Sequence, residues 1–250
     1  MARVLIPLPD RDFDVTEVAV PWRKLRDAGH EVVFATETAG TLPSADPLLL
    51  TGVVFGQLGA EPEPKRFYAN LVKSKAFKHT IGWSEIEPGA FDALVLPGGH
   101  APGMRQYLGS TDLHEKVAAF WALDRPVGAI CHGVLILARA QLDGRSLLHD
   151  RKTTCLPQYL ERIAYYSTAW KLGKYYRTYP AYVEEEVRKA LVDPAAQFER
   201  GPIGFARDSE VDHSPAFLVE DRNYLSARWP GDAYAFADRL VEKLDRPKPV

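Results

Sequence analysis

Residues 1–36 alternate between short apolar runs and one stripe of apolar positions. The run over 3–8 predicts a short buried strand, and from residue 15 to 25 apolar side chains recur at the spacing of one helix face. Gly29 ends this helix, and the apolar run over 30–36 predicts a second strand. A strand, a helix and a strand in so short a stretch form a βαβ unit, which implies two parallel strands joined by a right-handed crossover.

The same alternation continues along the chain. Apolar runs predict strands over 91–97 and 126–130, a further short strand is predicted over 151–155, and residues 217–219 and 224–227 predict a hairpin. Helical spacing predicts helices over 65–77, from 110 onward, over 132–140, two or three within 157–191, and a last one over 232–244. Strands that alternate with helices predict a doubly wound α/β fold, with a mostly parallel sheet, helices on both faces and an antiparallel hairpin near one edge.

Two stretches depart from this alternation. Residues 37–88 are irregular and contain several prolines, and residues 157–200 are helical and rich in tyrosine. We interpret both as insertions packed on a single domain that spans residues 1–250. The tyrosines between Tyr159 and Tyr182 are expected in helix packing or a dimer surface, or as a wall of a small-molecule pocket.

The charges of the chain nearly balance. Lys and Arg number 31, Asp and Glu number 33, and the formal net charge is −2. A nucleic-acid binder usually carries a basic excess or a basic stripe, so no nucleic-acid partner is expected. The apolar run near the N-terminus, over 4–8, is too short for a signal peptide or a membrane span, which predicts a cytoplasmic protein without a membrane partner.

Cys131 and Cys155 are too few for a disulfide framework or a four-sulfur zinc site. Free thiols are expected in a cytosolic protein, and the plainest interpretation of each is a small buried apolar side chain. For Cys155 this interpretation is kept.

The segment Gly128–Gly133 favours another interpretation for Cys131. An apolar strand ends at this cysteine and a helix begins at once, as in the nucleophile elbow of α/β enzymes. Gly133 would let the turn approach neighbouring backbone. The start of the helix is expected to favour the thiolate over the thiol, and the His132 N–H would point where an oxyanion develops.

Two further features belong to the same predicted sheet edge. Gly98 and Gly99 follow a parallel strand and would open the crevice in which α/β proteins bind ligands, although such a pair also makes a plain tight turn. Glu17 lies near the start of the first helix, where a lone glutamate is usually a solvated charge.

Taken together, these features resemble the DJ-1/PfpI (ThiJ-like) superfamily, which has a class I glutamine amidotransferase-like fold. The segments that carry the resemblance are Ala129–Gly133, Leu96–Gly99, Glu17 with Pro21 and Trp22, and Ser226–Gly231 followed by Phe236 and Ala237. The resemblance covers most of the chain except 37–88 and 157–200. Those additions, and His100 after the glycine pair, favour the larger Hsp31-like branch.

The resemblance implies a flavodoxin-like sheet, a homodimer and no cofactor. It implies Cys131 as the nucleophile, Glu17 as a carboxyl hydrogen-bonded to its sulfur, and the N–H groups of Gly99 and His132 as oxyanion donors. His100 is a further candidate, as a substrate-binding or proton-relay group. The expected function is a cofactor-independent cysteine enzyme for small carbonyl or acyl compounds, of the glyoxalase III type that converts methylglyoxal to lactate. The alternatives are a redox sensor or holdase chaperone that uses oxidation of Cys131, and a PfpI-type peptidase or amidase.

One position departs from the family pattern. Several branches place a proton acceptor just before a proline after the elbow helix, where this chain has Leu156 and Pro157. A general base must then come from His132, His100 or Glu17, and the order of residues leaves open whether the His132 imidazole reaches the sulfur. Although these groups and Cys131 could converge on an ion, the sequence has no closely spaced ligand pair, so no metal site is predicted.

Overall fold

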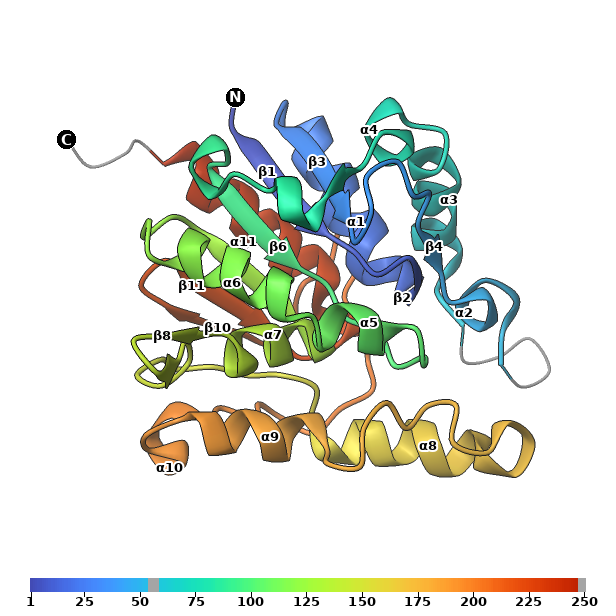
Figure 1. Ribbon diagram of the computed structural model, residues 1–250. Helices are drawn as coiled ribbons and strands as arrows, with labels where there is room; N and C mark the ends of the chain where they lie inside the picture. Colours follow the sequence, from blue (N-terminus) through green and yellow to red (C-terminus); the bar gives the residue numbers. More distant parts are fainter. Residues whose placement is uncertain (54–58, 247–250) are drawn as a thin grey trace.

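A seven-stranded sheet forms the centre of the protein, in the order β10-β11-β7-β6-β1-β3-β5. The computed structural model, shown in Figure 1, describes residues 1–53 and 59–246. All neighbouring strands pair in parallel except β10 and β11, which form the predicted antiparallel hairpin. The sheet strands are β1 (Arg3–Pro7), β3 (Glu31–Thr36), β5 (Ile81–Gly82), β6 (Ala93–Leu96), β7 (Val127–Ile130), β10 (Leu218–Asp221) and β11 (Tyr224–Ala227).

Helices cover both faces of this sheet, with α6 and α7 on one side and α1 and α11 on the other (Figure 1). The strands between them are buried over nearly their whole length, because a parallel sheet packs apolar side chains on both faces. The doubly wound, flavodoxin-like α/β fold predicted from the sequence is confirmed. The longer helices are α1 (Val15–Asp27), α3 (Pro62–Leu71), α6 (Thr111–Trp121), α7 (Val134–Arg139), α8 (Gln158–Leu172), α9 (Val183–Ala190) and α11 (Ala233–Asp245).

The first irregular stretch, 37–88, contributes to the sheet itself. It supplies the edge strand β5 and the strand β4, which pairs with β2 beside the main sheet. The helix predicted over 65–77 is two helices, because the Ser74 hydroxyl caps the start of α4 and the chain turns between them. Residues 54–58 of this stretch lie outside the described residues. The short elements of the chain are β2 (Arg11–Phe13), β4 (Ser44–Ala45), α2 (Pro47–Thr51), α4 (Lys75–Lys78), α5 (Met104–Leu108), β8 (Gln141–Leu142), β9 (Arg145–Ser146) and α10 (Pro194–Gln197).

The strand predicted over 151–155 is wrong. Thr153 makes a single parallel bridge to Phe198, and the segment joins no sheet. The place beside β7 is taken by β11, which pairs with β7 over its full length. The segment is mostly polar, and the backbone of Thr153 pairs with residues 197 and 199 instead of with the main sheet.

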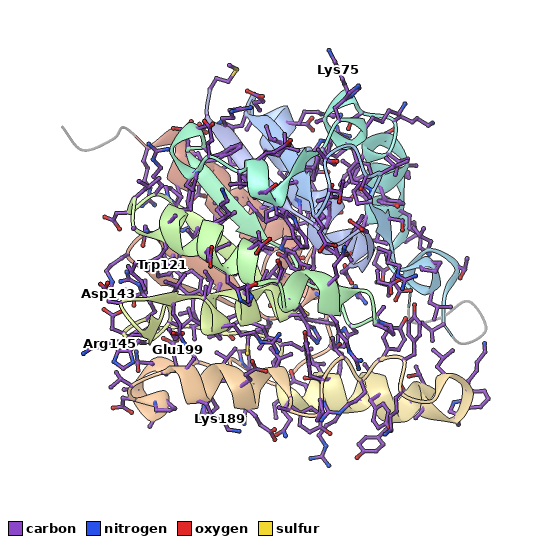
Figure 2. All side chains as sticks on the ribbon, viewed as in Figure 1. Lys75, Trp121, Asp143, Arg145, Lys189 and Glu199 are labelled. Atoms are coloured by element: carbon purple, nitrogen blue, oxygen red, sulfur yellow. The ribbon has the colours of Figure 1, made fainter. Side chains whose placement is uncertain are left out.

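The second predicted insertion forms a row of helices along one side of the molecule, where α8 and α9 follow one another (Figure 1). Its helical character is confirmed, and α9 packs against α7. Lys189 on α9 and Lys75 on α4 project outward from opposite sides of the molecule (Figure 2). Among the described residues, no helix is both long and apolar enough to cross a membrane.

Candidate active site

Cys131 lies on a sharp turn between β7 and α7. Its φ of 58° is in the left-handed region that non-glycine residues rarely adopt, and residues Cys131–Gly133 form a 3-10 turn before α7 begins. A Cβ added to Gly133 would lie 2.0 Å from the Leu96 carbonyl oxygen, so only glycine lets this turn pack against β6. The predicted elbow, with its small residue two positions after the cysteine, is confirmed.

The glycine pair after β6 touches this elbow. A Cβ added to Gly98 would lie 2.6 Å from the His132 backbone nitrogen, and one added to Gly99 would lie 2.8 Å from the Asp12 carbonyl oxygen. Both positions therefore need glycine because of close backbone approach. The arrangement brings the Gly98–Gly99 backbone beside the His132 N–H, as expected for a shared site.

Glu17 is fully buried, so the solvated charge that its position suggests is not what the structure has. The Asp14 side chain caps α1 by accepting hydrogen bonds from the N–H groups of Thr16 and Glu17. Glu17 Oε2 then accepts a hydrogen bond of 2.7 Å from the Gly98 N–H, and the carboxyl lies close enough to Cys131 to influence the pKa of its thiol. Burial, and next the charge of Asp14, raise the pKa of Glu17 well above its ordinary value. A protonated Glu17 can donate a hydrogen bond, which an ionised one cannot.

The Cys131 thiol is not activated as the sequence analysis expected. Burial, followed by the charge of Glu17, raises its pKa well above the ordinary value, although the His132 backbone N–H acts in the opposite direction. The predicted preference for thiolate is therefore wrong, because the desolvation of a thiol that is 1% exposed outweighs the field at the start of a six-residue helix. Cys131 is held as a neutral thiol that needs a base.

His132 supplies a base within reach. Its Nδ1 lies 3.5 Å from Cys131 Sγ, which settles the question that the sequence left open. Burial, and next the neighbouring His100, lower the pKa of His132 well below its ordinary value, so the ring is neutral. A neutral imidazole accepts a proton through one nitrogen only, and its neighbours decide which.

Thr178 decides the tautomer of His132. The Thr178 hydroxyl donates a 2.6 Å hydrogen bond to the His100 carbonyl oxygen, and Thr178 Oγ1 itself lies 3.3 Å from His132 Nε2. Because its own proton is committed, Thr178 Oγ1 accepts the proton of Nε2–H. The lone pair of His132 is then on Nδ1, which faces the sulfur. No pattern in the sequence singles out Thr178, although the residue belongs to the tyrosine-rich segment that was expected to pack or to wall a pocket.

His100 stands over the same pair of side chains. Its ring meets the His132 ring edge to face, with centroids 4.6 Å apart, and burial lowers its pKa to about 4. Its Nε2 is buried and has no hydrogen-bond partner among the described residues. The structure therefore brings together all five residues predicted for the site, and it adds Thr178.

The α8–α9 loop, residues 173–182, covers the site. Tyr176 packs edge to face on His100, and the hydroxyls of Tyr175 and Tyr176 donate to the two carboxylate oxygens of Asp46, at 3.1 and 3.0 Å. Arg105 fixes the loop from the other side by donating to the Thr178 carbonyl oxygen. The loop leaves Cys131 1% exposed and His132 fully buried.

The position where relatives place a further proton acceptor has no such group. Leu156 is buried, and so is Cys155 beside it, whose sulfur lies 3.7 Å from the Leu156 carbonyl oxygen. Cys155 is thus a buried cysteine, as expected.

The fold and this arrangement define a class of protein: a flavodoxin-like α/β protein with a buried cysteine on a nucleophile elbow and a histidine beside it. A model described as ThiJ/PfpI family-like matches residues 8–202, and the chain belongs to this family.

Relatives agree with this assignment. A deglycase of Pyrococcus abyssi is 26% identical over 97% of this chain and 99% of its own. The protein/nucleic acid deglycase 2 of Escherichia coli is 31% identical over 59% of this chain and 70% of its own. The crystal structure of glyoxalase III from Candida albicans shares the fold, with a TM-score of 0.69, 22% identity, and 97% of each chain covered.

Proposed function

We propose that this protein is a cofactor-independent cysteine enzyme that converts small carbonyl compounds, with methylglyoxal to lactate as the reaction of the glyoxalase III type. The observation that carries the proposal is the contact between Cys131 Sγ and His132 Nδ1 at 3.5 Å, on an elbow beside the buried Glu17. This pair supplies a nucleophile and the base that it needs.

The first step follows from this geometry. As Cys131 Sγ attacks the aldehyde carbon, His132 Nδ1 takes the thiol proton, and a hemithioacetal oxyanion forms. The N–H groups of Gly99 and His132 and a protonated Glu17 are the donors for that oxyanion. His132 returns its proton to the oxygen, which restores the neutral imidazole and gives the hemithioacetal.

The remaining steps move protons and add water. A base removes the hydrogen of the former aldehyde carbon, the neighbouring carbonyl carbon receives a proton, and a thioester of a hydroxy acid remains on Cys131. Water then cleaves the thioester to the acid and the free thiol. The sum is methylglyoxal plus water to lactic acid, with no external oxidant. His132, together with His100, is the candidate for the base.

Burial of the site supports a small substrate. Cys131 is 1% exposed under the α8–α9 loop, which a dicarbonyl of a few heavy atoms can pass with less movement than a peptide or a glycated protein. This observation favours the glyoxalase reaction over a peptidase or amidase reaction.

The decisive experiment is a steady-state assay of lactate formation from methylglyoxal with the wild type, Cys131→Ala and the matched control Cys155→Ala. We expect turnover in the wild type and in the Cys155 variant, and none with Cys131→Ala. Turnover that survives Cys131→Ala contradicts the proposal.

The same preparation tests the alternative functions. A redox sensor predicts negligible turnover and clean oxidation of Cys131 to a sulfinate by mild peroxide, which intact-mass measurement detects. A neutral thiol with a raised pKa reacts slowly with peroxide, which favours the enzyme. The predicted homodimer, cytoplasmic location and single domain stay predictions, and sedimentation equilibrium measures the first of them.

A further inference from the structure

Three ligand-bearing side chains meet at the elbow. Cys131, His132 and His100 each place one sulfur or nitrogen atom so that the three atoms all lie within 4.8 Å of one another. Two of these residues are sequence neighbours on the turn after β7, and the third follows the glycine pair after β6. Only the parallel pairing of the two strands brings them together, which explains why residue spacing predicted no such site.

The distances between the three ligand atoms are close to those between the ligands of a coordinated metal ion. Zn²⁺ binds sulfur at about 2.3 Å and imidazole nitrogen at about 2.0–2.1 Å, so ligand atoms of one tetrahedral ion lie roughly 3–4 Å apart. The Cys131 Sγ to His132 Nδ1 distance of 3.5 Å already falls in that range. The other two pairs lie within 4.8 Å, so closing on one ion requires a shift of at most about 1–2 Å.

The hydrogen bonds around the cluster match what a metal-ligating histidine needs. His132 offers the Nδ1 lone pair, because its Nε2–H is directed at Thr178, whose hydroxyl is held by the His100 carbonyl oxygen. A ligating histidine almost always donates its other ring N–H to such a fixed partner. His100 Nε2 is a buried atom without a hydrogen-bond partner among the described residues, which is costly unless a ligand meets it.

We propose that Cys131, His132 and His100 form a binding site for a thiophilic divalent cation, with Zn²⁺ as the expected ion. One thiolate and two imidazoles form a donor set typical of zinc, whereas Mg²⁺ and Ca²⁺ require oxygen ligands. On binding, the S–H bond breaks, the sulfur binds the ion, and the proton leaves to solvent. Both histidines bind through a lone pair and keep their other proton, and a water molecule takes the fourth position.

Metal binding and catalysis then compete for the same atoms. This consequence rests on the proposed function, because the ion occupies the sulfur that would attack the carbonyl and the nitrogen that would take its proton. Zn²⁺ is therefore expected to inhibit turnover reversibly, and a chelator is expected to restore it.

Co²⁺ is the probe, because its binding is visible without turnover. The full chain, with its thiols kept reduced in a non-chelating buffer, should bind one equivalent of Co²⁺ with a thiolate charge-transfer band and the intense visible bands of tetrahedral cobalt. Zn²⁺ should displace it. We expect Cys131→Ser to abolish the charge-transfer band. His100→Ala should raise the Kd for Co²⁺ by at least about 10-fold. Cys155→Ser, the control, should bind Co²⁺ as the wild type does. Circular dichroism of each variant establishes that it is folded.

The outcomes separate this proposal from the proposed function. Wild-type protein that turns over methylglyoxal and binds no Co²⁺ overturns the metal site and leaves the enzyme standing. Protein that binds Co²⁺ in this way but does not turn over methylglyoxal overturns the proposed function and leaves the metal site standing. A cobalt spectrum unchanged in both Cys131→Ser and His100→Ala means that the ion binds elsewhere, which also overturns the site. If His100→Ala fails to fold, His100→Asn provides the same comparison with a ring-sized polar side chain.

Discussion

Cys131 and Cys155 lie equally deep in the protein. Their exposed fractions are 1% and 0%, and burial is the first cause that raises the pKa of each thiol. Carboxylates raise both pKa values further, Glu17 at Cys131 and Glu184 at Cys155. By exposure and by acidity alone, the two cysteines are hard to tell apart.

Their immediate partners differ. Cys131 sits at a positive φ on the elbow, with His132 Nδ1 at 3.5 Å, whereas the sulfur of Cys155 faces the Leu156 carbonyl oxygen, which takes up no proton at neutral pH. The comparison teaches that a buried thiol in this protein gains a chemical role from a base within reach. A low pKa is not required when proton transfer accompanies the attack.

The largest expected effect comes from removing that base. His132→Ala leaves Cys131, like Cys155, without a base within reach of its sulfur. We expect kcat for lactate formation to fall by on the order of 10²–10⁴-fold. Steady-state kinetics measure the loss. A variant that keeps more than half of the wild-type kcat would show that another group takes the proton.

Replacing Thr178 tests how His132 is held. Thr178→Val keeps the shape of the side chain but loses the acceptor for Nε2–H, so we expect kcat to fall roughly 10-fold through loss of one buried hydrogen bond. Thr178→Ser keeps the hydroxyl and should stay near the wild type. Nitrogen NMR of the imidazole distinguishes positioning from general damage, because only a positioning role requires the tautomer of His132 to change in the valine variant.

The pKa of the Cys131 thiol should respond to Glu17. The carboxylate charge raises this pKa, so Glu17→Gln should lower it and shift thiolate formation to lower pH. Ultraviolet titration of thiolate absorbance in a Cys155→Ser background measures the change without interference from the second cysteine. A matched titration of Cys155 in a Cys131→Ser background should show no shift, and a shift there would mean that the substitution acts through the whole fold.

The smallest expected effect is on the access of reagents to the Cys131 thiol. Tyr176→Phe removes one hydrogen bond between the α8–α9 loop and Asp46, which corresponds to about 2- to 10-fold faster opening of the loop. Iodoacetamide should label Cys131 before Cys155 in the wild type, and the variant should speed only the first reaction. Peptide mapping after brief labelling gives the two rates. Equal acceleration at both cysteines would point to global unfolding rather than loop opening.

Local patterns of the sequence were sufficient for much of this protein. Helical spacing predicted the helices and continuous apolar runs predicted most strands of the sheet, since a helix with one buried face and a strand buried on both faces each leave a direct trace in residue order. The elbow at Cys131 and the need for Gly133 were also predictable, because a strand, a nucleophile and a helix follow one another within a few residues. The strand predicted over 151–155 failed because residue order does not show which sheet edge is already occupied.

Only the tertiary structure decided the chemistry of the thiol. The pKa of Cys131 depends first on how deeply the elbow is buried, and burial is a property of the whole fold that the helix following the cysteine does not reveal. Thr178 reaches His132 from 46 residues away, and its role depends on a proton already committed to the His100 carbonyl oxygen. Such contacts between distant segments leave no periodicity in the sequence, because each residue alone is an ordinary polar side chain in a loop.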